Sequence, residues 1–404
     1  MSVRPTTPIR DVEDEPMGAR ERIRPTGMAL PFDLVLILGV VGLAAASLIT
    51  LRAATADDIA GSPRFYFDRQ AIFFAVGGVI MLVLSRLDYS LLRRARWGVY
   101  GFLMASIFAV MAVGSVAKGA QRSIPLGPFQ FQASELGKVL IIVSLAAFAS
   151  DRARQAGDRQ TTARIMLLAL VPAALVMIQP DLGSSLVYGA IALAILYFAG
   201  VPGRHFLALA ALGAVAISLV LVAAPRAGVE VLHDYQKQRL TSFLHPSDDP
   251  SDAGYQQNQS LIAIGSGQKT GRGDRATQTK FNFLPEHHTD FINAVVGERW
   301  GFVGAGLVLS LYALLIWRGL RILTMAKDLF GALLAGGIVA MLLFQVFVNV
   351  GMTLGIMPIT GIPLPLMSYG GSSVVSTLLA IGLLQSIYVQ GRQSAALKGR
   401  IVSH

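Results

Sequence analysis

About ten apolar stretches dominate this sequence, and each is long enough to cross a lipid bilayer. The chain is 53% hydrophobic and only 14% charged, whereas a soluble domain carries about a quarter charged residues. A span needs about 20 apolar residues in helical form, because backbone groups in lipid must be hydrogen-bonded within the segment. The sequence therefore predicts an all-α polytopic membrane protein. The expected transmembrane helices cover roughly residues 30–51, 70–88, 98–117, 134–150, 164–180, 182–200, 204–224, 291–317, 329–356 and 366–390.

Basic residues between these spans predict the orientation of the chain. They gather after the even-numbered spans, on the same side as the N-terminal segment, and such loops stay in the cytoplasm. We therefore expect both termini in the cytoplasm, with residues 1–29 as a disordered tail, residues 30–391 as the membrane domain and residues 392–404 as a C-terminal tail. The residues that carry this argument are Arg86, Arg93, Arg94, Arg96, Arg152, Arg154, Arg159, Arg164, Arg204, Arg318, Arg321, Lys327, Arg392, Lys398 and Arg400.

The longest connection lies on the opposite side, between the seventh and eighth spans. It covers residues 225–290, which is far longer than an ordinary connection, and such loops are usually functional or disordered. Its aromatic residues favour function, so we interpret it as a large extracellular loop. Its glycine-rich stretch "GSGQKTGRG" (265–273) does not match a phosphate-binding P-loop.

The absence of cysteine and the placement of the positive charge argue against two kinds of function, cysteine-based chemistry and nucleic-acid binding. The chain has no cysteine, which excludes disulfides, thiolate nucleophiles and cysteine-bound metals. The net charge of +10 is carried largely by the expected cytoplasmic loops, where arginines anchor the protein to anionic membrane lipids. No nucleic-acid partner is therefore expected.

The stretch "FLPEHHTD" (283–290) places several proton-handling groups at the entrance of the eighth span. Glu286 and Asp290 are four residues apart, so they would share one face if the stretch were helical. Such carboxylates either complement the dipole at the start of a helix or provide a general base that takes a proton from a hydroxyl. His287 and His288 suggest zinc, but neither HExxH spacing nor a third ligand is evident.

A second polar group surrounds the start of the fourth span, in "KGAQRSIPLGPFQFQASELGK" (118–138). Glu135 and Lys138 are three residues apart and would pair along a helix, while Arg122 lies upstream. Charges at membrane depth are candidates for function, and Arg and Lys suit a phosphate ligand. The alternative is a self-neutralising pair near the interface. In "IQPDLGSS" (178–185), Asp181 is expected either to cap a helix or to line a pocket.

A third polar feature is the proline- and glycine-rich stretch "TLGIMPITGIPLPLMSYGGSS" (353–373), which contains Ser368. Irregular backbone of this kind cannot face lipid and must be buried in protein or line a cavity. From the residues alone we expect an outward-facing cavity with carboxylates on one side and cations on the other. Transfer from a diphosphate-linked donor fits this arrangement, and proton-coupled transport fits it nearly as well.

At these positions the chain resembles the SEDS family, the RodA and FtsW peptidoglycan glycosyltransferases, over nearly all its length except the N-terminal tail. "AQR" before the extracellular segment and "TQ" before "FLPE" look closer to RodA. The family usually has Trp, Pro and Ala where Ser123, Ala133 and Gly137 stand, and an acidic pair where Glu298–Arg299 stands. The motifs that carry the resemblance are "YFDRQ", "GAQRSIPLGPFQFQASELGK", "QPDLGSSLV", "YQKQRLTSFLHPSDDP", "GYQQNQSLIAIGSG", "TQTKFNFLPEHHTDFINAVVGERWGF" and "GIPLPLMSYGGSS".

The resemblance implies polymerisation of lipid II into β-1,4 glycan strands at the outer face of the bacterial cytoplasmic membrane, with inversion and release of undecaprenyl diphosphate. Asp290 would be the general base, and Arg122 and Lys138 would bind the pyrophosphate. Glu135 would orient Lys138, and Glu286 would orient Asp290 or bind sugar hydroxyls. Further substrate contacts are expected from Asp181, His288 and Ser368.

The resemblance also implies partners. A class B penicillin-binding protein, which is a transpeptidase, would cross-link the product, together with other elongation or division machinery. A divalent cation, Mg²⁺ or Mn²⁺, on the diphosphate is chemically reasonable, and no other cofactor is expected. The alternatives are a flippase or proton-coupled transporter of a lipid-linked cell-wall precursor, and a non-catalytic scaffold of morphogenesis or division.

Overall fold

The structure, a computed structural model, describes residues 32–220, 224–226, 243, 253–281 and 283–402, apart from 57, 60, 118, 119 and 128. The expected N-terminal tail, residues 1–29, lies outside the described residues. So do residues 403 and 404 and most of the first half of the long loop after the seventh span. The folded unit discussed below begins at Phe32.

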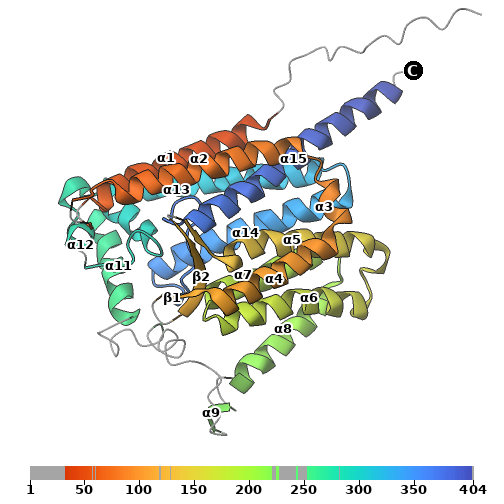
Figure 1. The fold of residues 1–404 in the computed structure, drawn as a ribbon, viewed down its shortest axis with the longest axis horizontal. Helices are drawn as coiled ribbons and strands as arrows, with labels where there is room; N and C mark the ends of the chain where they lie inside the picture. The colour runs from red at the N-terminus through yellow and green to blue at the C-terminus, as the bar shows by residue number, and fades with distance from the viewer. Residues whose placement is uncertain are drawn as a thin grey trace, which may run out of the picture. The chain divides into compact units, whose positions relative to one another are not determined.

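In the part of the chain that the structure describes, ten apolar helices form the body of the protein, in agreement with the predicted spans (Figure 1). Within the described part of the chain, eight of them are long and apolar enough to cross a membrane, and α7 and α8 are shorter. The expectation of an all-α polytopic membrane protein is therefore confirmed. The ten helices are α1 (Leu34–Ala54), α2 (Phe65–Arg86), α4 (Arg96–Val113), α5 (Ala133–Asp151), α6 (Arg159–Ile178), α7 (Leu182–Phe198), α8 (Gly203–Ser218), α13 (Ile292–Met325), α14 (Leu329–Thr353) and α15 (Gly371–Val402).

Short elements connect these helices. Three strands pair antiparallel in the order β1-β2-β3 in the connection between α4 and α5. These strands were not predicted from the sequence. α15 continues to Val402, so most of the segment 392–404, which we expected as a separate tail, extends this helix. The short elements are β1 (Ser115–Ala117), β2 (Ala120–Leu126), β3 (Phe129–Phe131), α3 (Ser90–Arg94), α9 (Ala224–Arg226), α11 (Ala253–Gly267), α12 (Thr277–Lys280), and the 3₁₀ turns η1 (Ala153–Gln155) and η3 (Gly273–Arg275).

α5 is the central helix of the bundle. Its most apolar stretch is 89% buried, whereas the corresponding stretches of α2 and α4 are only 22% buried. A helix that is apolar on all sides is stable either in a protein core or against lipid. The high buried fraction places α5 in the core, and the low buried fractions indicate that α2 and α4 face lipid. α5 is packed against α4, α7, α14 and α15, while the outer faces of α2 and α4 are suited to lipid.

α2 and α15 approach each other closely through glycines. A Cβ atom on Gly77 would lie 2.6 Å from Leu378 Cδ1, and one on Gly382 would lie 2.9 Å from Met81 Cα. Small residues at such contacts allow the backbones of membrane helices to pack closely. The contact brings the start of α2 beside the segment that precedes α15 (Figure 1).

α13 is broken near its beginning, although the sequence predicted one span there. Gly301 has φ 66° and ψ −160°, so residues 292–300 and 302–325 are two helical pieces. The glycine-rich stretch 265–273 packs against this break: Arg272 N donates to Glu298 O at 2.8 Å, and Phe302 N donates to Gln268 O at 2.8 Å. The glycines of this stretch therefore allow it to approach α13: a Cβ on Gly267 would lie 1.9 Å from Gly297 O.

Candidate functional site

The stretch that carries Asp290 forms a series of turns rather than the start of a helix. α13 begins at Ile292, and Glu286 has φ 57°, in the left-handed region. Glu286 Oε2 accepts a hydrogen bond from Thr289 Oγ1 at 3.0 Å. The carbonyl oxygen of Glu286 accepts bonds from the backbone N–H groups of Thr289 and Phe291. Glu286 and Asp290 thus do not share a helix face, because the positive φ at Glu286 is incompatible with one.

The irregular segment 361–370 holds this turn from the other side. Ser368 Oγ donates to the carbonyl oxygen of Thr289 at 2.6 Å and accepts from Leu364 N at 2.8 Å. Tyr369 N donates to the carbonyl oxygen of His288 at 2.9 Å. Ser368 is 1% exposed, so in this structure its hydroxyl joins two loops, and its predicted contact with substrate stays a prediction.

Asn349 of α14 fixes Asp290 itself. Its Nδ2 donates to the carbonyl oxygens of Asp290 at 2.9 Å and Ile362 at 2.8 Å. Asp290 as a whole is half-buried. Its backbone is therefore fixed near the end of a buried membrane helix.

Side chains of the first two helices, α1 and α2, form hydrogen bonds to the backbone of the same irregular segment. Gln70 of α2 is fully buried, and its Nε2 donates to the carbonyl oxygen of Ser368 at 3.1 Å. Gln70 Oε1 accepts from Gly370 N at 3.3 Å. Ser47 Oγ of α1 donates to the carbonyl oxygen of Met367 at 2.9 Å. Buried polar groups in a membrane helix need partners, and here the partners are the free carbonyls of the irregular segment.

The predicted cationic side of the site lies on α5. Lys138 Nζ lies 2.6 Å from Glu135 Oε1, and the side chains are 2% and 5% exposed. The predicted pairing along the helix face is confirmed. The structure places the pair inside the protein rather than at the interface.

Asp181 is joined to the same end of α5. It caps α7, since its Oδ1 accepts from Ser184 N at 3.0 Å, and its Oδ2 accepts from Ser134 Oγ at 2.7 Å and Gln132 Nε2 at 3.2 Å. The capping interpretation of Asp181 is therefore confirmed. Its role as a substrate contact stays a prediction.

Ser372 links this group to the turn that carries Asp290. Its Oγ accepts from Gln132 N at 3.0 Å and donates to the carbonyl oxygen of Gln130 at 2.5 Å. Ser372 follows Tyr369 within three residues, so one short stretch of chain contacts both β3 and the turn at His288. Arg122 lies on β2, in the same small sheet. Its guanidinium Nε is buried and has no hydrogen-bond partner among the described residues.

The rings of Tyr66, His288 and Tyr369 form an aromatic cluster at the turn that carries Asp290. The ring of His288 lies 4.5 Å from that of Tyr66 and 5.9 Å from that of Tyr369, measured between centroids. Burial raises the pKa of the Tyr369 phenol, and the neighbouring Arg69 opposes the rise. Tyr369 therefore remains neutral at physiological pH and keeps its O–H group.

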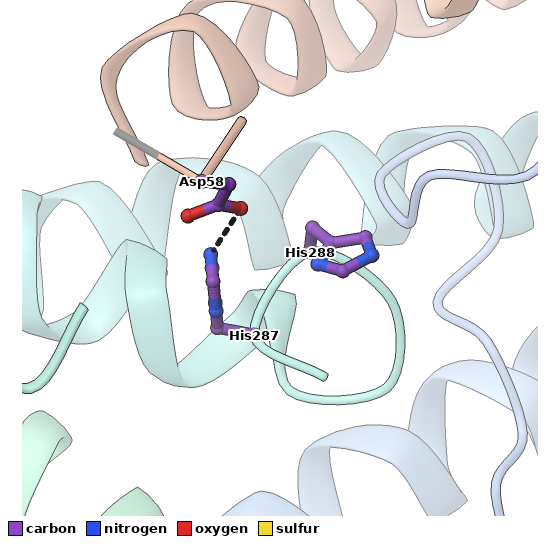
Figure 2. Close-up of side chains that lie close together, drawn as sticks. All are labelled: Asp58, His287 and His288. Atoms are coloured by element: carbon purple, nitrogen blue, oxygen red, sulfur yellow. Dashed lines mark ion pairs between the residues drawn. The ribbon is translucent and has the colours of Figure 1, made fainter. Parts of the chain in front are cut away.

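The ring of His287 lies 5.3 Å from that of His288, measured between centroids, and its Nε2 points toward the connection between α1 and α2. Its Nε2 lies 3.1 Å from Asp58 Oδ2, as Figure 2 shows. Asp58, His287 and His288 each offer one ligand atom, and these atoms lie within 4.8 Å of one another. They are the group of possible metal ligands found in the described part of the chain, and the sequence had indicated only the two histidines.

One departure from the family pattern has a structural explanation. A Cβ on Gly137 would lie 1.9 Å from the hydroxyl of Tyr188, which donates to the carbonyl oxygen of Ser134 at 3.2 Å. Tyr188 therefore occupies the space that an alanine methyl group would take. Another departure is at Glu298–Arg299. The carboxylate of Glu298 accepts hydrogen bonds from Gln278 N, Thr279 N and Thr279 Oγ1, and so positions the segment before the Asp290 turn.

These observations define the class of protein: a multi-helix membrane protein in which one irregular segment fixes a carboxylate-bearing turn, and in which the central helix α5 carries a buried Lys–Glu pair. A family profile described as cell cycle protein, covering FtsW, RodA and SpoVE, matches residues 28–393. The chain belongs to this family.

Individual relatives cover almost the whole chain. "Peptidoglycan glycosyltransferase MrdB" of Escherichia coli K12 is 38% identical over 361 residues, which is 88% of this chain and 93% of the relative. "Stage V sporulation protein E" of Bacillus subtilis is 34% identical over 363 residues, again 88% of this chain and 96% of the relative.

Solved structures agree with the fold. A chain of a peptidoglycan synthase complex, described as coordinating polymerisation and crosslinking, superposes with a TM-score of 0.76 at 31% identity, covering 90% of this chain and 99% of that chain. The rod shape determining protein RodA of Thermus thermophilus superposes with a TM-score of 0.65 at 28% identity, covering 91% and 98%.

Proposed function

We propose that this chain polymerises lipid II into glycan strands, with Asp290 as the general base. The protein is a peptidoglycan glycosyltransferase, in line with relatives of that name that match it over nearly their full length. The observation that carries the assignment of the base is the position of the half-buried Asp290 on a turn that Asn349 and Ser368 fix by hydrogen bonds. A base must be held rigidly within reach of the hydroxyl that it deprotonates.

In the proposed step, the 4-hydroxyl of one GlcNAc attacks the anomeric carbon of MurNAc on a second lipid II. Asp290 takes the hydroxyl proton as the new C–O bond forms. The bond from the anomeric carbon to the diphosphate oxygen breaks, and its electron pair leaves with undecaprenyl diphosphate. Attack from the opposite face inverts the anomeric carbon, which gives a β-1,4 linkage.

Arg122 and Lys138 are proposed to stabilise the charge on this leaving group. The buried Nε of Arg122 has no partner among the described residues, and a buried guanidinium nitrogen of this kind suits a phosphate oxygen. Lys138 is neutralised by Glu135 at 2.6 Å, so it contributes to binding only when the pair opens or shares its charge. Donors aimed at a developing charge in a water-poor site lower the barrier strongly.

The residues do not fit the expected Mg²⁺ or Mn²⁺. The group of possible ligands in the described chain contains two imidazoles and one carboxylate, whereas Mg²⁺ and Mn²⁺ prefer oxygen ligands. We therefore derive no step of the transfer through a metal.

The side of the membrane and the partner belong to the same proposal. The basic residues predict that the Asp290 turn faces outward, where the lipid II sugars are displayed. A solved relative comes from a complex that coordinates polymerisation and crosslinking, which supports a class B penicillin-binding protein as the partner of this chain.

The decisive experiment uses the full chain, purified with and without a cognate class B penicillin-binding protein, and labelled lipid II. Glycan strands are resolved on a gel for wild type and Asp290→Asn, with lipid II binding measured in parallel. The control is Asp158→Asn, because this carboxylate at the start of α6 makes no capping bond. We expect polymer from wild type and the control only, with binding retained throughout. Polymer from Asp290→Asn at the wild-type rate would reject the base, and lipid movement without polymer would favour a transporter.

A further inference from the structure

The His287–Asp58 pair has an arrangement that glycosyl transfer does not require. His287 is 2% exposed, and its Nδ1 lies 3.1 Å from the carbonyl oxygen of Leu284. A carbonyl oxygen has no proton to give, so Nδ1 must carry the ring proton of the neutral imidazole. The lone pair is then on Nε2, which lies 3.1 Å from Asp58 Oδ2.

A lone pair that faces a carboxylate oxygen at this distance is repulsive unless a positive charge lies between them. His287 Nε2 is buried and takes part in no hydrogen bond among the described residues. The two atoms are therefore placed to share one positive charge, which is either a proton on Nε2 or a metal cation bound by both. The bond from Nδ1 to a backbone carbonyl is the second contact that metal-binding histidines usually make, because it fixes the ring and its tautomer.

His288 provides a third donor. Its ring lies to one side of the Asp58–His287 pair (Figure 2), and the three ligand atoms lie within 4.8 Å of one another. Ligand atoms on one tetrahedral zinc ion, with bonds of about 2.0–2.1 Å, lie roughly 3.3 Å apart. The pair at 3.1 Å already has this spacing. All three ligand atoms lie within 4.8 Å of one another, so binding one zinc ion requires His288 to move toward the pair.

We propose that Asp58, His287 and His288 bind one zinc ion, with water in the fourth position. Two imidazoles and one carboxylate are ligands that zinc accepts. The ion would join the connection between α1 and α2 to the turn that ends at Asp290. The inference stands independently of the proposed polymerase activity, because it concerns binding of the metal alone.

The test measures zinc directly, on the full chain purified in detergent without a histidine tag and dialysed against a chelator. Zn²⁺ is titrated against a chromophoric competitor, and bound metal is counted by mass spectrometry. We expect one zinc ion per chain and, from X-ray absorption, nitrogen and oxygen ligands at about 2.0–2.1 Å. His287→Gln, His288→Gln and Asp58→Asn should each weaken zinc binding by about 10- to 100-fold or more.

His205→Gln is the matched control, because His205 is also buried but its Nδ1 bonds to Thr162 Oγ1 at 2.7 Å, far along the chain from the proposed ligands. Its zinc affinity should equal that of wild type.

No bound zinc in folded wild type would overturn the proposal. Wild-type affinity in His288→Gln would also overturn it, since Asp58 and His287 would then share only a proton. If His287→Gln does not fold, the other two variants still decide the question. None of these measurements uses lipid II, so a failed polymerisation assay leaves them unaffected.

Discussion

Asn349 holds Asp290 and Ile362 at once, through two hydrogen bonds from a single amide nitrogen. Asn349→Leu removes both bonds and leaves two carbonyl oxygens without this donor. Each such group costs about 1–3 kcal/mol, so we expect a lower unfolding temperature and polymerisation reduced at least tenfold. Thermal unfolding in detergent and the glycan gel measure the two effects.

Gln345→Leu is the control for this change. Gln345 lies one helical turn earlier in α14, and its Oε1 has no hydrogen-bond partner among the described residues. Leucine at this position should keep both stability and activity near wild type. An equal loss in both variants would show that α14 tolerates no apolar replacement, and the specific role of Asn349 would be rejected.

Variants of the Lys138–Glu135 pair can distinguish a role in stability from a role in polymerisation. Lys138→Met or Glu135→Gln alone leaves one buried charge without its partner, which costs about 3–5 kcal/mol. The double variant removes both charges, and we expect it to recover most of the stability. Its polymerisation should nevertheless stay low, because no cation remains on α5 for the diphosphate. Full activity in a stable double variant would show that the pair serves only folding.

Gly137 and Tyr188 should be energetically coupled. Gly137→Ala places a methyl group 1.9 Å from the Tyr188 hydroxyl, and overpacking of this kind costs about 1–3 kcal/mol. Tyr188→Phe removes the hydroxyl and loses one hydrogen bond, worth about 1 kcal/mol. In a double-mutant cycle read by thermal unfolding, we expect Gly137→Ala to be clearly less harmful when it is combined with Tyr188→Phe. Additive effects would contradict the contact.

Gly301 should be irreplaceable where α13 breaks. Its φ of 66° disfavours a side chain, and a Cβ would lie 2.4 Å from Gly271 N. Gly301→Ala should therefore lower the free energy of unfolding by about 2 kcal/mol or more. Gly306→Ala in the same helix is the comparison, since a Cβ there meets nothing within 4 Å. Similar unfolding temperatures for the two variants would show that the break is not required.

Apolar patterning was sufficient to predict the helices, because only helical segments satisfy their backbone in lipid. It predicted neither the break at Gly301 nor the short sheet around Arg122. Both depend on contacts with residues far along the chain, which composition does not record. The charged pair Glu298–Arg299 stands just before the break, but apolar residues lie on both sides of it, so the whole stretch resembled one span.

The site was predictable as a set of motifs but not as a network. Spacing predicted the Glu135–Lys138 pair, because both residues lie on one helix. The same argument was wrong for Glu286 and Asp290, since the turn there has a residue with positive φ. Gln70, Asn349 and Asp58 were missed as site residues. Gln70 and Asn349 are polar residues within apolar helices, a signal that was available. Asp58 lies in an ordinary connecting loop, and only the fold shows that it faces His287.

The segment 361–370 has a consequence for how the protein is made. It emerges late in translation, yet Ser47 and Gln70 of the first two helices bond to it across the bundle. Near the opposite ends of these helices, Asp33 exchanges two hydrogen bonds with Gln385 of α15. Contacts that join distant parts of a chain form late. We therefore expect the Asp290 turn to reach its final shape only after the last helix has been inserted, and a chain that lacks α15 to be inactive.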